Sequence, residues 1–220
     1  MKKGYSYIIL AILLILPILW IVFWGEAKHS AKKLPIYFER QVGENSDTIY
    51  HTIPYFSFIN QDGDSVTPRT FENSVYVANF FFATCKDVCP NMNRNLSMVV
   101  SHFKNQDNVK FISHTVHPEH DSVEVLKEYA HRFKAEAPKW NFVTGKKREL
   151  YKIAAEGYKV NAAQQMDGEV PNFFHTEKLI LVDKQGRVRG VFESGDMREL
   201  KNLEDAIKAL LFEYNEPVVN

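Results

Sequence analysis

Residues 75–90 read VYVANFFFATCKDVCP, and this stretch decides the fold. Its first eight residues are almost all apolar, which is typical of a central strand buried on both faces of a sheet. Cys85 and Cys89 follow at once, and residues 90–103 then carry apolar side chains at helical spacing. The stretch therefore predicts a buried strand, a turn that holds both cysteines of the chain, and a helix.

Strands and helices alternate along the rest of the chain. Residues 55–60 alternate in polarity and precede a Gln-Asp-Gly-Asp turn, which predicts an opening hairpin. Further strands are predicted at residues 109–116, 140–143, 178–183 and 188–192, and further helices from Asp121 or Ser122 to residue 133, at 147–156 and at 200–212. This order predicts an α/β, thioredoxin-like fold with an N-terminal hairpin, a late hairpin and helices on both faces of the sheet.

The N-terminal residues predict a single transmembrane helix ahead of this fold. Residues 7–24 are 18 consecutive residues without a charge, close to the roughly 20 apolar residues that span a bilayer. This run exceeds the apolar core of a signal peptide, which is about 7–15 residues long. We therefore expect an uncleaved membrane anchor in residues 1–25, a polar tether in residues 26–50 and one compact domain in residues 51–215.

Composition excludes several classes of function. The 220 residues carry 27 Lys and Arg against 27 Asp and Glu, so no excess of positive charge indicates a nucleic-acid partner. Two cysteines are too few for a disulfide-stapled domain, or for a zinc site of four cysteines from one chain. The position of these two cysteines is more informative than their number.

The spacing of Cys85 and Cys89 indicates a joint site. An i, i+4 pair lies on one side of a helical turn, so the two sulfurs can bind one ion or close a short disulfide. A helix N-terminus stabilises thiolates, and two thiolates favour soft cations such as Cu(I). Such a site needs a third ligand, for which histidine is the best candidate type. The pattern alone leaves two choices, His175 or a histidine of the 114–120 cluster.

Four blocks of sequence, in order, resemble the Sco/SenC family, whose members are membrane-tethered copper proteins of cytochrome c oxidase assembly. The blocks are residues 79–92 with the CxxxCP motif, residues 111–121, residues 140–145 (WNFVTG), and residues 175–186 with His175-Thr176 and LVDKQG. The resemblance covers most of residues 54–212. It implies a thioredoxin-like fold and a copper site formed by Cys85, Cys89 and His175. Cu(I) is the expected ion and Cu(II) the alternative, since Cu(II) could oxidise the two thiolates to a disulfide.

One position departs from the family pattern. The residue before Pro118 is aspartate in the family and His117 here. This departure puts a role for that acid near the site in doubt. It also raises the hypothesis that His117 or His114 offers an auxiliary ligand, against the simpler alternative of an exposed histidine at a strand end.

The resemblance implies a copper metallochaperone. Such a protein would deliver copper to the CuA site of cytochrome c oxidase subunit II, or would prepare the thiols of that site. Other copper carriers or thiol reductants would be its further partners. Residues 7–24 would hold it in a bacterial inner (cytoplasmic) membrane as a single-pass protein with its C-terminal domain outside, in the periplasm.

The alternative hypothesis is an enzyme, a membrane-anchored thiol-disulfide oxidoreductase in which Cys85 and Cys89 are the redox pair. Thioredoxins place two residues between their cysteines, whereas this chain places three. His175 would then have no part in the chemistry. If copper binds only when both cysteines are reduced, metal loading and disulfide formation are mutually exclusive states of one site.

Overall fold

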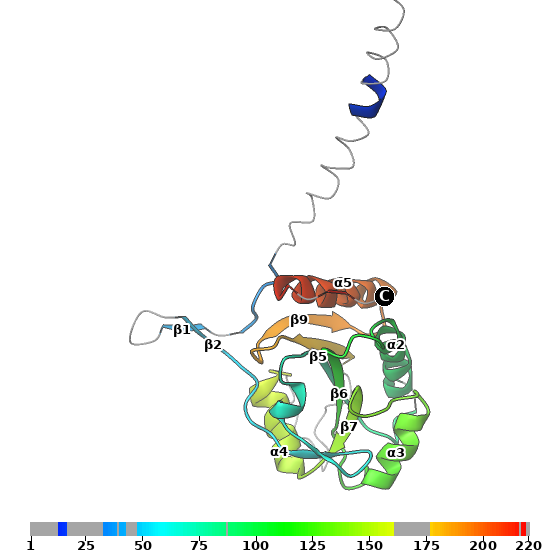
Figure 1. Ribbon diagram of the computed structural model, residues 1–220. Coiled ribbons are helices and arrows are strands. Elements are labelled where there is room, and N and C mark those ends of the chain that lie inside the picture. The colour runs from blue at the N-terminus through cyan, green and yellow to red at the C-terminus, as the bar shows by residue number, and fades with distance from the viewer. Residues whose placement is uncertain are drawn as a thin grey trace, which may run out of the picture. The chain divides into compact units, whose positions relative to one another are not determined.

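The computed structural model describes residues 13–16, 33–38, 40–42, 48–86, 88–160, 177–215 and 217–218. The chain divides into two compact units, Met1–Lys32 and Lys33–Asn220. In the first unit, residues 13–16 are helical. In the second unit, a two-stranded antiparallel ribbon of β1 (Arg40–Val42) and β2 (Thr48–Tyr50) precedes the main sheet (Figure 1).

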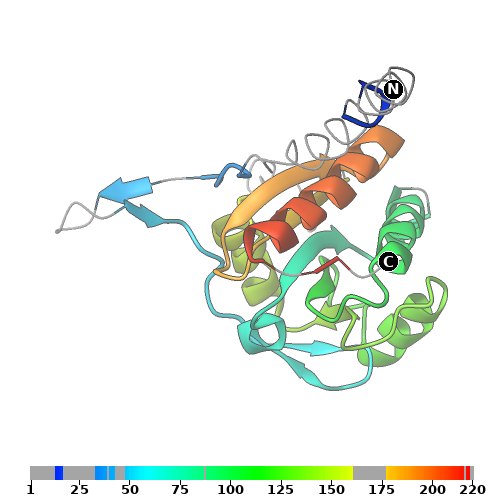
Figure 2. The ribbon, with the colours of Figure 1, turned by 45° about the horizontal axis from the view of Figure 1, so that its top comes forward.

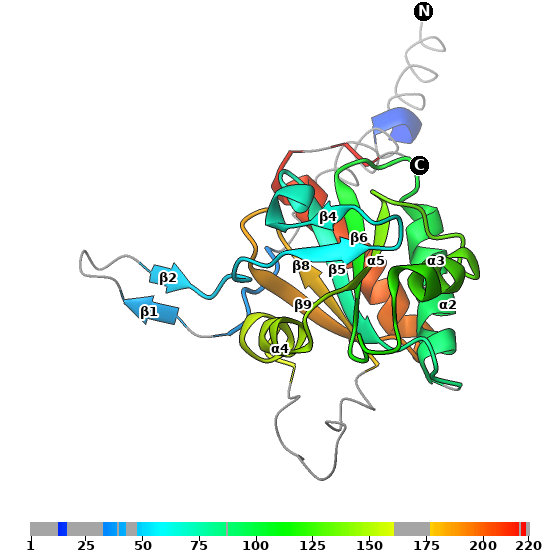
Figure 3. The same ribbon diagram turned by 90° about the horizontal axis from the view of Figure 1, so that it is seen from below.

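The second unit is built on a seven-stranded mixed sheet with the order β4-β3-β7-β6-β5-β8-β9 (Figure 3). The strands are β3 (Phe58–Asn60), β4 (Ser65–Val66), β5 (Val75–Phe81), β6 (Val109–Thr115), β7 (Trp140–Thr144), β8 (Lys178–Val182) and β9 (Val188–Glu193). Strands β5, β6 and β7 are parallel, and the outer strands pair antiparallel. Every residue of β5 is buried, because it lies between β6 and β8 and is covered on both faces.

Helices cover both faces of this sheet. They are η1 (Pro68–Phe71), α2 (Val88–His102), α3 (Val123–His131), α4 (Lys147–Lys152), η2 (Ile153–Gly157) and α5 (Met197–Glu213). Helices α2, α3 and α5 pack on one face, and η1, α4 and η2 on the other. Helix α5 lies along β9 (Figure 2).

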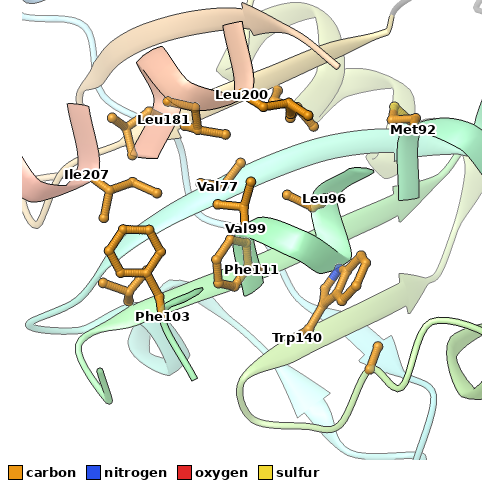
Figure 4. Close-up of a cluster of buried hydrophobic side chains, with 14 of the residues drawn as sticks. Val77, Met92, Leu96, Val99, Phe103, Phe111, Trp140, Leu181, Leu200 and Ile207 are labelled. Atoms are coloured by element: carbon orange, nitrogen blue, oxygen red, sulfur yellow. The ribbon is translucent and has the colours of Figure 1, made fainter. Parts of the chain in front are cut away.

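Each face of the sheet has its own hydrophobic core. The first core joins α2, α3 and α5 to the sheet, with Leu96, Phe111 and Trp140 fully buried near its centre (Figure 4). The second core joins α4 and η1 to the opposite face through Phe58, Ile112 and other apolar side chains. Burial of apolar surface on both sides is the main source of stability for such a layered domain.

The segment ahead of the ribbon contacts the domain, although it falls in the predicted tether. The Tyr37 N–H donates to the Val188 carbonyl at 2.9 Å. Arg189 donates to the carbonyls of Leu34 at 2.8 Å and Pro35 at 3.1 Å. Its guanidinium also pairs with the carboxylates of Asp183 and Glu213, so a buried cation holds this segment against β9 and α5. Those ion-pair distances are 2.9 Å to Asp183 and 2.8 Å to Glu213.

The predicted α/β architecture is confirmed, and the element boundaries shift by a few residues. Helix α2 begins at Val88, two residues ahead of the prediction, so that Pro90 sits in its first turn. That turn tolerates proline because its N–H groups have no partner inside the helix. Helix α5 begins at Met197 because Asp196 caps it by accepting a hydrogen bond from the Arg198 N–H at 2.8 Å.

The predicted anchor falls mostly outside the described residues. Of residues 7–24, the structure describes 13–16, which are helical. Within the described part of the chain, no helix has both the length and the apolar character needed to cross a membrane. The anchor in residues 1–25 stays a prediction.

Candidate metal centre

Cys85 and Cys89 lie where β5 ends and α2 begins. Cys85 is half-buried in the turn after β5, and Cys89 is buried in the first turn of α2. Both are thiols in this structure. The backbone N–H of Cys89 donates a hydrogen bond to Cys85 Sγ at 3.3 Å. Cys85 Sγ therefore accepts from the N-terminal end of the helix, where unpaired amides and the helix dipole favour a negative sulfur.

Cys89 is the more protected of the two sulfurs. Its side chain belongs to the first core and is 6% exposed. Burial raises the pKa of the Cys89 thiol to about 12; the neighbouring Cys85 and Asp121 add to the rise, and a backbone hydrogen bond with Phe82 opposes it. Cys89 therefore keeps its proton at neutral pH unless a cation displaces it.

A buried carboxylate ties the cysteine turn to the end of β6. Asp121 Oδ2 accepts a hydrogen bond from the Ala83 N–H at 3.1 Å and another from the Thr115 hydroxyl. Thr115 Oγ1 in turn accepts from the His117 N–H at 2.9 Å. The Asp121 side chain is fully buried, and this burial raises its pKa.

Sequence reasoning missed this role of Asp121. The sequence pattern offers Asp121 or Ser122 as the cap of α3, whereas in the structure Ser122 is the cap, because its Oγ accepts a hydrogen bond from the Val125 N–H at 3.4 Å. An acid next to an adequate capping serine was the available signal, because only one of the two side chains can take the capping position.

His114 is buried in the second core, away from Cys89, which belongs to the first. Its ring is fully buried and contacts Phe58 and Phe80, with ring centroids 5.6 Å and 5.2 Å away. Burial lowers the pKa of His114 to about 3, and its Nε2 lies 3.3 Å from the Tyr158 hydroxyl. This location favours a packing role for His114 over the auxiliary metal ligand hypothesised from the sequence.

His117 follows the last residue of β6, at the same end of the sheet as the cysteine turn that follows β5. It is half-buried, and its ring centroid is 4.2 Å from that of His120, which is exposed. His175 lies in residues 161–176, outside the described residues. Among the residues that the structure does describe, no group of three or more His, Cys, Asp or Glu side chains could hold a metal ion.

A chain of buried polar side chains links the cysteine helix to the sheet. Trp140 Nε1 donates to Ser113 Oγ at 2.9 Å, and Ser113 Oγ donates to Asn79 Oδ1 at 2.6 Å. Asn79 Nδ2 donates to Asn93 Oδ1 at 2.9 Å, and Asn93 Nδ2 donates to the Tyr129 hydroxyl at 3.2 Å. Burial raises the pKa of Tyr129, and the nearby cysteines add to that rise. These bonds run from β7 across β6 and β5 to α2 and α3, so they fix the helix that carries Cys89.

The family model and three solved structures that the chain resembles all point to the same family. The family model described as SCO1/SenC matches residues 44–211. A SCO1/SenC family lipoprotein from Bacillus anthracis is 26% identical in sequence, with a TM-score of 0.64. The match covers 73% of this chain and 95% of that one.

Two further solved structures resemble the chain over similar lengths. BsSco, described as a member of the Sco family of cytochrome c oxidase assembly proteins with a disulfide switch, is 25% identical with a TM-score of 0.61, over 72% of this chain and 93% of that one. ScoI from Bradyrhizobium japonicum, solved with copper bound, is 26% identical with a TM-score of 0.59, over 73% of this chain and 99% of that one.

Proposed function

This chain belongs to the SCO1/SenC family, and on that premise we propose that it is a copper metallochaperone that binds copper as cargo through Cys85, Cys89 and His175. The recipient is the CuA site of cytochrome c oxidase subunit II. A copper-bound relative and a relative from oxidase assembly support the proposal. The observation that carries it is the thiol pair at the N-terminus of α2, with Cys89 donating its N–H to Cys85 Sγ.

The topology of the described strands supports His175 as the third ligand. Strands β5 and β8 are antiparallel neighbours, with Tyr76 opposite Val182 and Ala78 opposite Ile180. The first residue of β8, Lys178, therefore lies at the end of the sheet where β5 ends and the cysteine turn begins. Three residues of chain span at most about 11 Å, so the covalent chain holds position 175 within that distance of Lys178.

The start of β8 is also connected to the cysteine helix. The Ser194 N–H donates to the Glu177 carbonyl at 2.8 Å. Asn95 of α2 donates to the Ser194 carbonyl, also at 2.8 Å. These two bonds tie the residue two positions after His175 to the helix that begins at the cysteines, which is the arrangement a shared site needs.

The thiols define the chemistry of loading and release. Cu(I) is a soft cation that prefers thiolate and imidazole ligands, and its binding replaces the proton of Cys89, which otherwise stays in place at neutral pH. A recipient thiolate or imidazole can then exchange with one ligand at a time. The half-buried Cys85 is the ligand that such a partner reaches first.

Anchoring gives the protein access to a membrane-bound recipient. We propose that residues 7–24 hold it in the bacterial cytoplasmic membrane with the C-terminal domain outside. Confinement to the same membrane raises the effective concentration of the domain near the oxidase.

The deciding experiment measures Cu(I) affinity of the full chain, reduced and anaerobic, in a neutral detergent. We expect one Cu(I) per chain, bound with an affinity that Cys85→Ser and His175→Ala each lower by more than about 100-fold, because loss of a ligand costs more than loss of an outer-shell partner. His131→Ala, an exposed histidine at the end of α3, is the matched control. Full affinity in His175→Ala would remove the three-ligand site.

A second candidate function uses the same thiols as a dithiol reductant. The 3.3 Å contact between the Cys89 N–H and Cys85 Sγ places the two residues side by side, and BsSco has a disulfide switch. In this reaction the thiols of Cys85 and Cys89 give two electrons and two protons to a partner disulfide, so that they become a disulfide while the partner becomes a dithiol. This reaction does not need His175. Turnover of a disulfide substrate by the His175→Ala variant would therefore favour the reductase over the chaperone.

A further inference from the structure

A basic groove runs along the outside of the cysteine helix. It lies between α2 and the turn that follows α3, residues 132–134. Helices α2 and α3 are neighbours in both views of the domain (Figures 1 and 3). Its volume is about 630 Å³, and its lining begins at Pro90, the residue after Cys89. The groove is therefore continuous in sequence and in space with the candidate metal centre.

The lining of this groove combines cations with apolar side chains. Four cations and three large apolar side chains line it, together with Pro90 and two serines. The cations are Arg94, Lys104, Arg132 and Lys134, and the apolar side chains are Met98, Val100 and Phe133. No carboxylate among the described residues lines it. Met98 is 41% exposed, so its apolar surface is open to a partner.

Among the described residues, carboxylates compensate few of the cations in this groove. Arg132 pairs with Glu128 on its own helix at 3.1 Å, and Arg94 donates to the amide oxygen of Asn91 at 3.1 Å. Within the described residues, no carboxylate pairs with Arg94, Lys104 or Lys134. Because residues 26–220 carry a net charge of −2, this positive potential is local to the groove and not a property of the whole domain.

We propose that this groove binds an extended acidic segment of the protein that receives the metal. The lining residues on α2, from Pro90 to Ser101, cover about 17 Å of helix axis, which matches about five residues of extended chain. Acidic side chains would pair with the four cations, and one apolar side chain would pack on Met98 and Phe133. A groove lined by both cations and apolar side chains fits a peptide with acidic and apolar residues better than the flat surface of an anionic membrane or a nucleic acid.

The proposal deepens the proposed function, since it names the chemistry of the partner that docks beside Cys89. Binding in the groove does not itself need copper. An experiment can therefore refute peptide binding in the groove without refuting copper binding to Cys85 and Cys89. It can equally refute copper binding without refuting peptide binding.

The test measures fluorescence anisotropy of a labelled probe peptide, Glu-Asp-Leu-Glu-Asp-Leu, with the full chain in neutral detergent. The amide peptide Gln-Asn-Leu-Gln-Asn-Leu is the control for charge. We expect binding of the acidic peptide alone, and about 10-fold weaker binding in the double variant Arg94→Glu, Arg132→Glu. Both arginines are exposed, so this variant should fold, and unchanged Cu(I) affinity would confirm that the metal centre is intact.

A second double variant controls for general electrostatics. Arg148→Glu with Lys152→Glu places the same charge change on the α4 side of the sheet, and it should leave peptide affinity within about 2-fold. Equal loss in both variants, or equal binding of the acidic and amide peptides, would overturn the proposal. Displacement of the peptide by an equal concentration of dihexanoyl phosphatidylglycerol would overturn it in favour of a lipid headgroup.

Discussion

Asn93 tests whether the buried polar chain holds the cysteine helix against the sheet. Its side chain is fully buried, one helical turn after Cys89. Its Oδ1 accepts from Asn79 Nδ2 at 2.9 Å, and its Nδ2 donates to the Tyr129 hydroxyl at 3.2 Å. The substitution Asn93→Ala removes both bonds and leaves two buried polar groups without these partners.

The expected cost follows from these two bonds. Each buried polar group left without its partner costs about 1–3 kcal/mol, and the small cavity left behind adds on the order of 1 kcal/mol. We therefore expect the free energy of unfolding to fall by about 3–7 kcal/mol. That is a large share of the roughly 5–15 kcal/mol that stabilises an ordinary domain.

Two asparagines on the same helix are matched controls. Asn95 is half-buried and makes one bond, to the Ser194 carbonyl at 2.8 Å, so Asn95→Ala should cost about 1 kcal/mol. Asn91 is exposed, and Asn91→Ala should stay within about 0.5 kcal/mol of the wild type. Urea titration of the reduced full chain gives all three values. A loss in Asn93→Ala no greater than that in Asn95→Ala would refute the structural role of the polar chain.

Three further predictions follow from buried ionisable groups. The pKa of Cys89 is about 12, against about 8.5 for an exposed thiol, so folding retains its proton. Under reducing conditions, the free energy of unfolding should therefore decline as the pH rises from about 8.5 to about 12. The decline should exceed that of the Cys89→Ser variant by at most about 5 kcal/mol. Asp121→Ala should lose about 2 kcal/mol relative to Asp121→Asn, which keeps an oxygen acceptor for the Ala83 N–H, and amide hydrogen exchange at Ala83 should speed up in the alanine variant alone. Arg189→Met removes a cation that is 2% exposed, so it should cost about 3–5 kcal/mol and expose residues 33–38 to proteases. Arg198→Met, at a side chain that is 90% exposed, should change neither stability nor protease sensitivity.

Much of the fold could be predicted because local and long-range preferences agree. The apolar run of β5 can be buried only at the interior of a sheet, and its neighbours confirm that position. Boundaries moved where one side chain decides them. Asp196 starts α5 at Met197, three residues before the first residue that the apolar spacing marks, because a cap acts through a hydrogen bond that periodicity does not record.

Contacts between residues close in sequence could be predicted for the candidate site. Contacts that depend on how the strands of the sheet are arranged could not. Cys85 and Cys89 are four residues apart, so their proximity follows from the backbone alone. The sequence groups His114 with His117 because both lie near the predicted end of a strand. Alternation along β6 separates them, since His114 points into the second core with Ile112.

The end of the sheet at which a segment lies, and not its distance in sequence, decides which residues can share the candidate metal centre. β5 and β6 are parallel, so their last residues lie at the same end of the sheet, and the Val116 N–H joins them there by donating to the Phe81 carbonyl at 2.8 Å. β8 is antiparallel to β5, so it begins at that end. The proposed ligand His175 precedes β8 in the chain, so it can approach a thiol that follows β5, although 86 positions separate it from Cys89. The buried bonds of Asp121 and Asn93 fix the cysteine turn and helix at this end of the sheet before any metal binds, which lowers the ordering cost of forming the site.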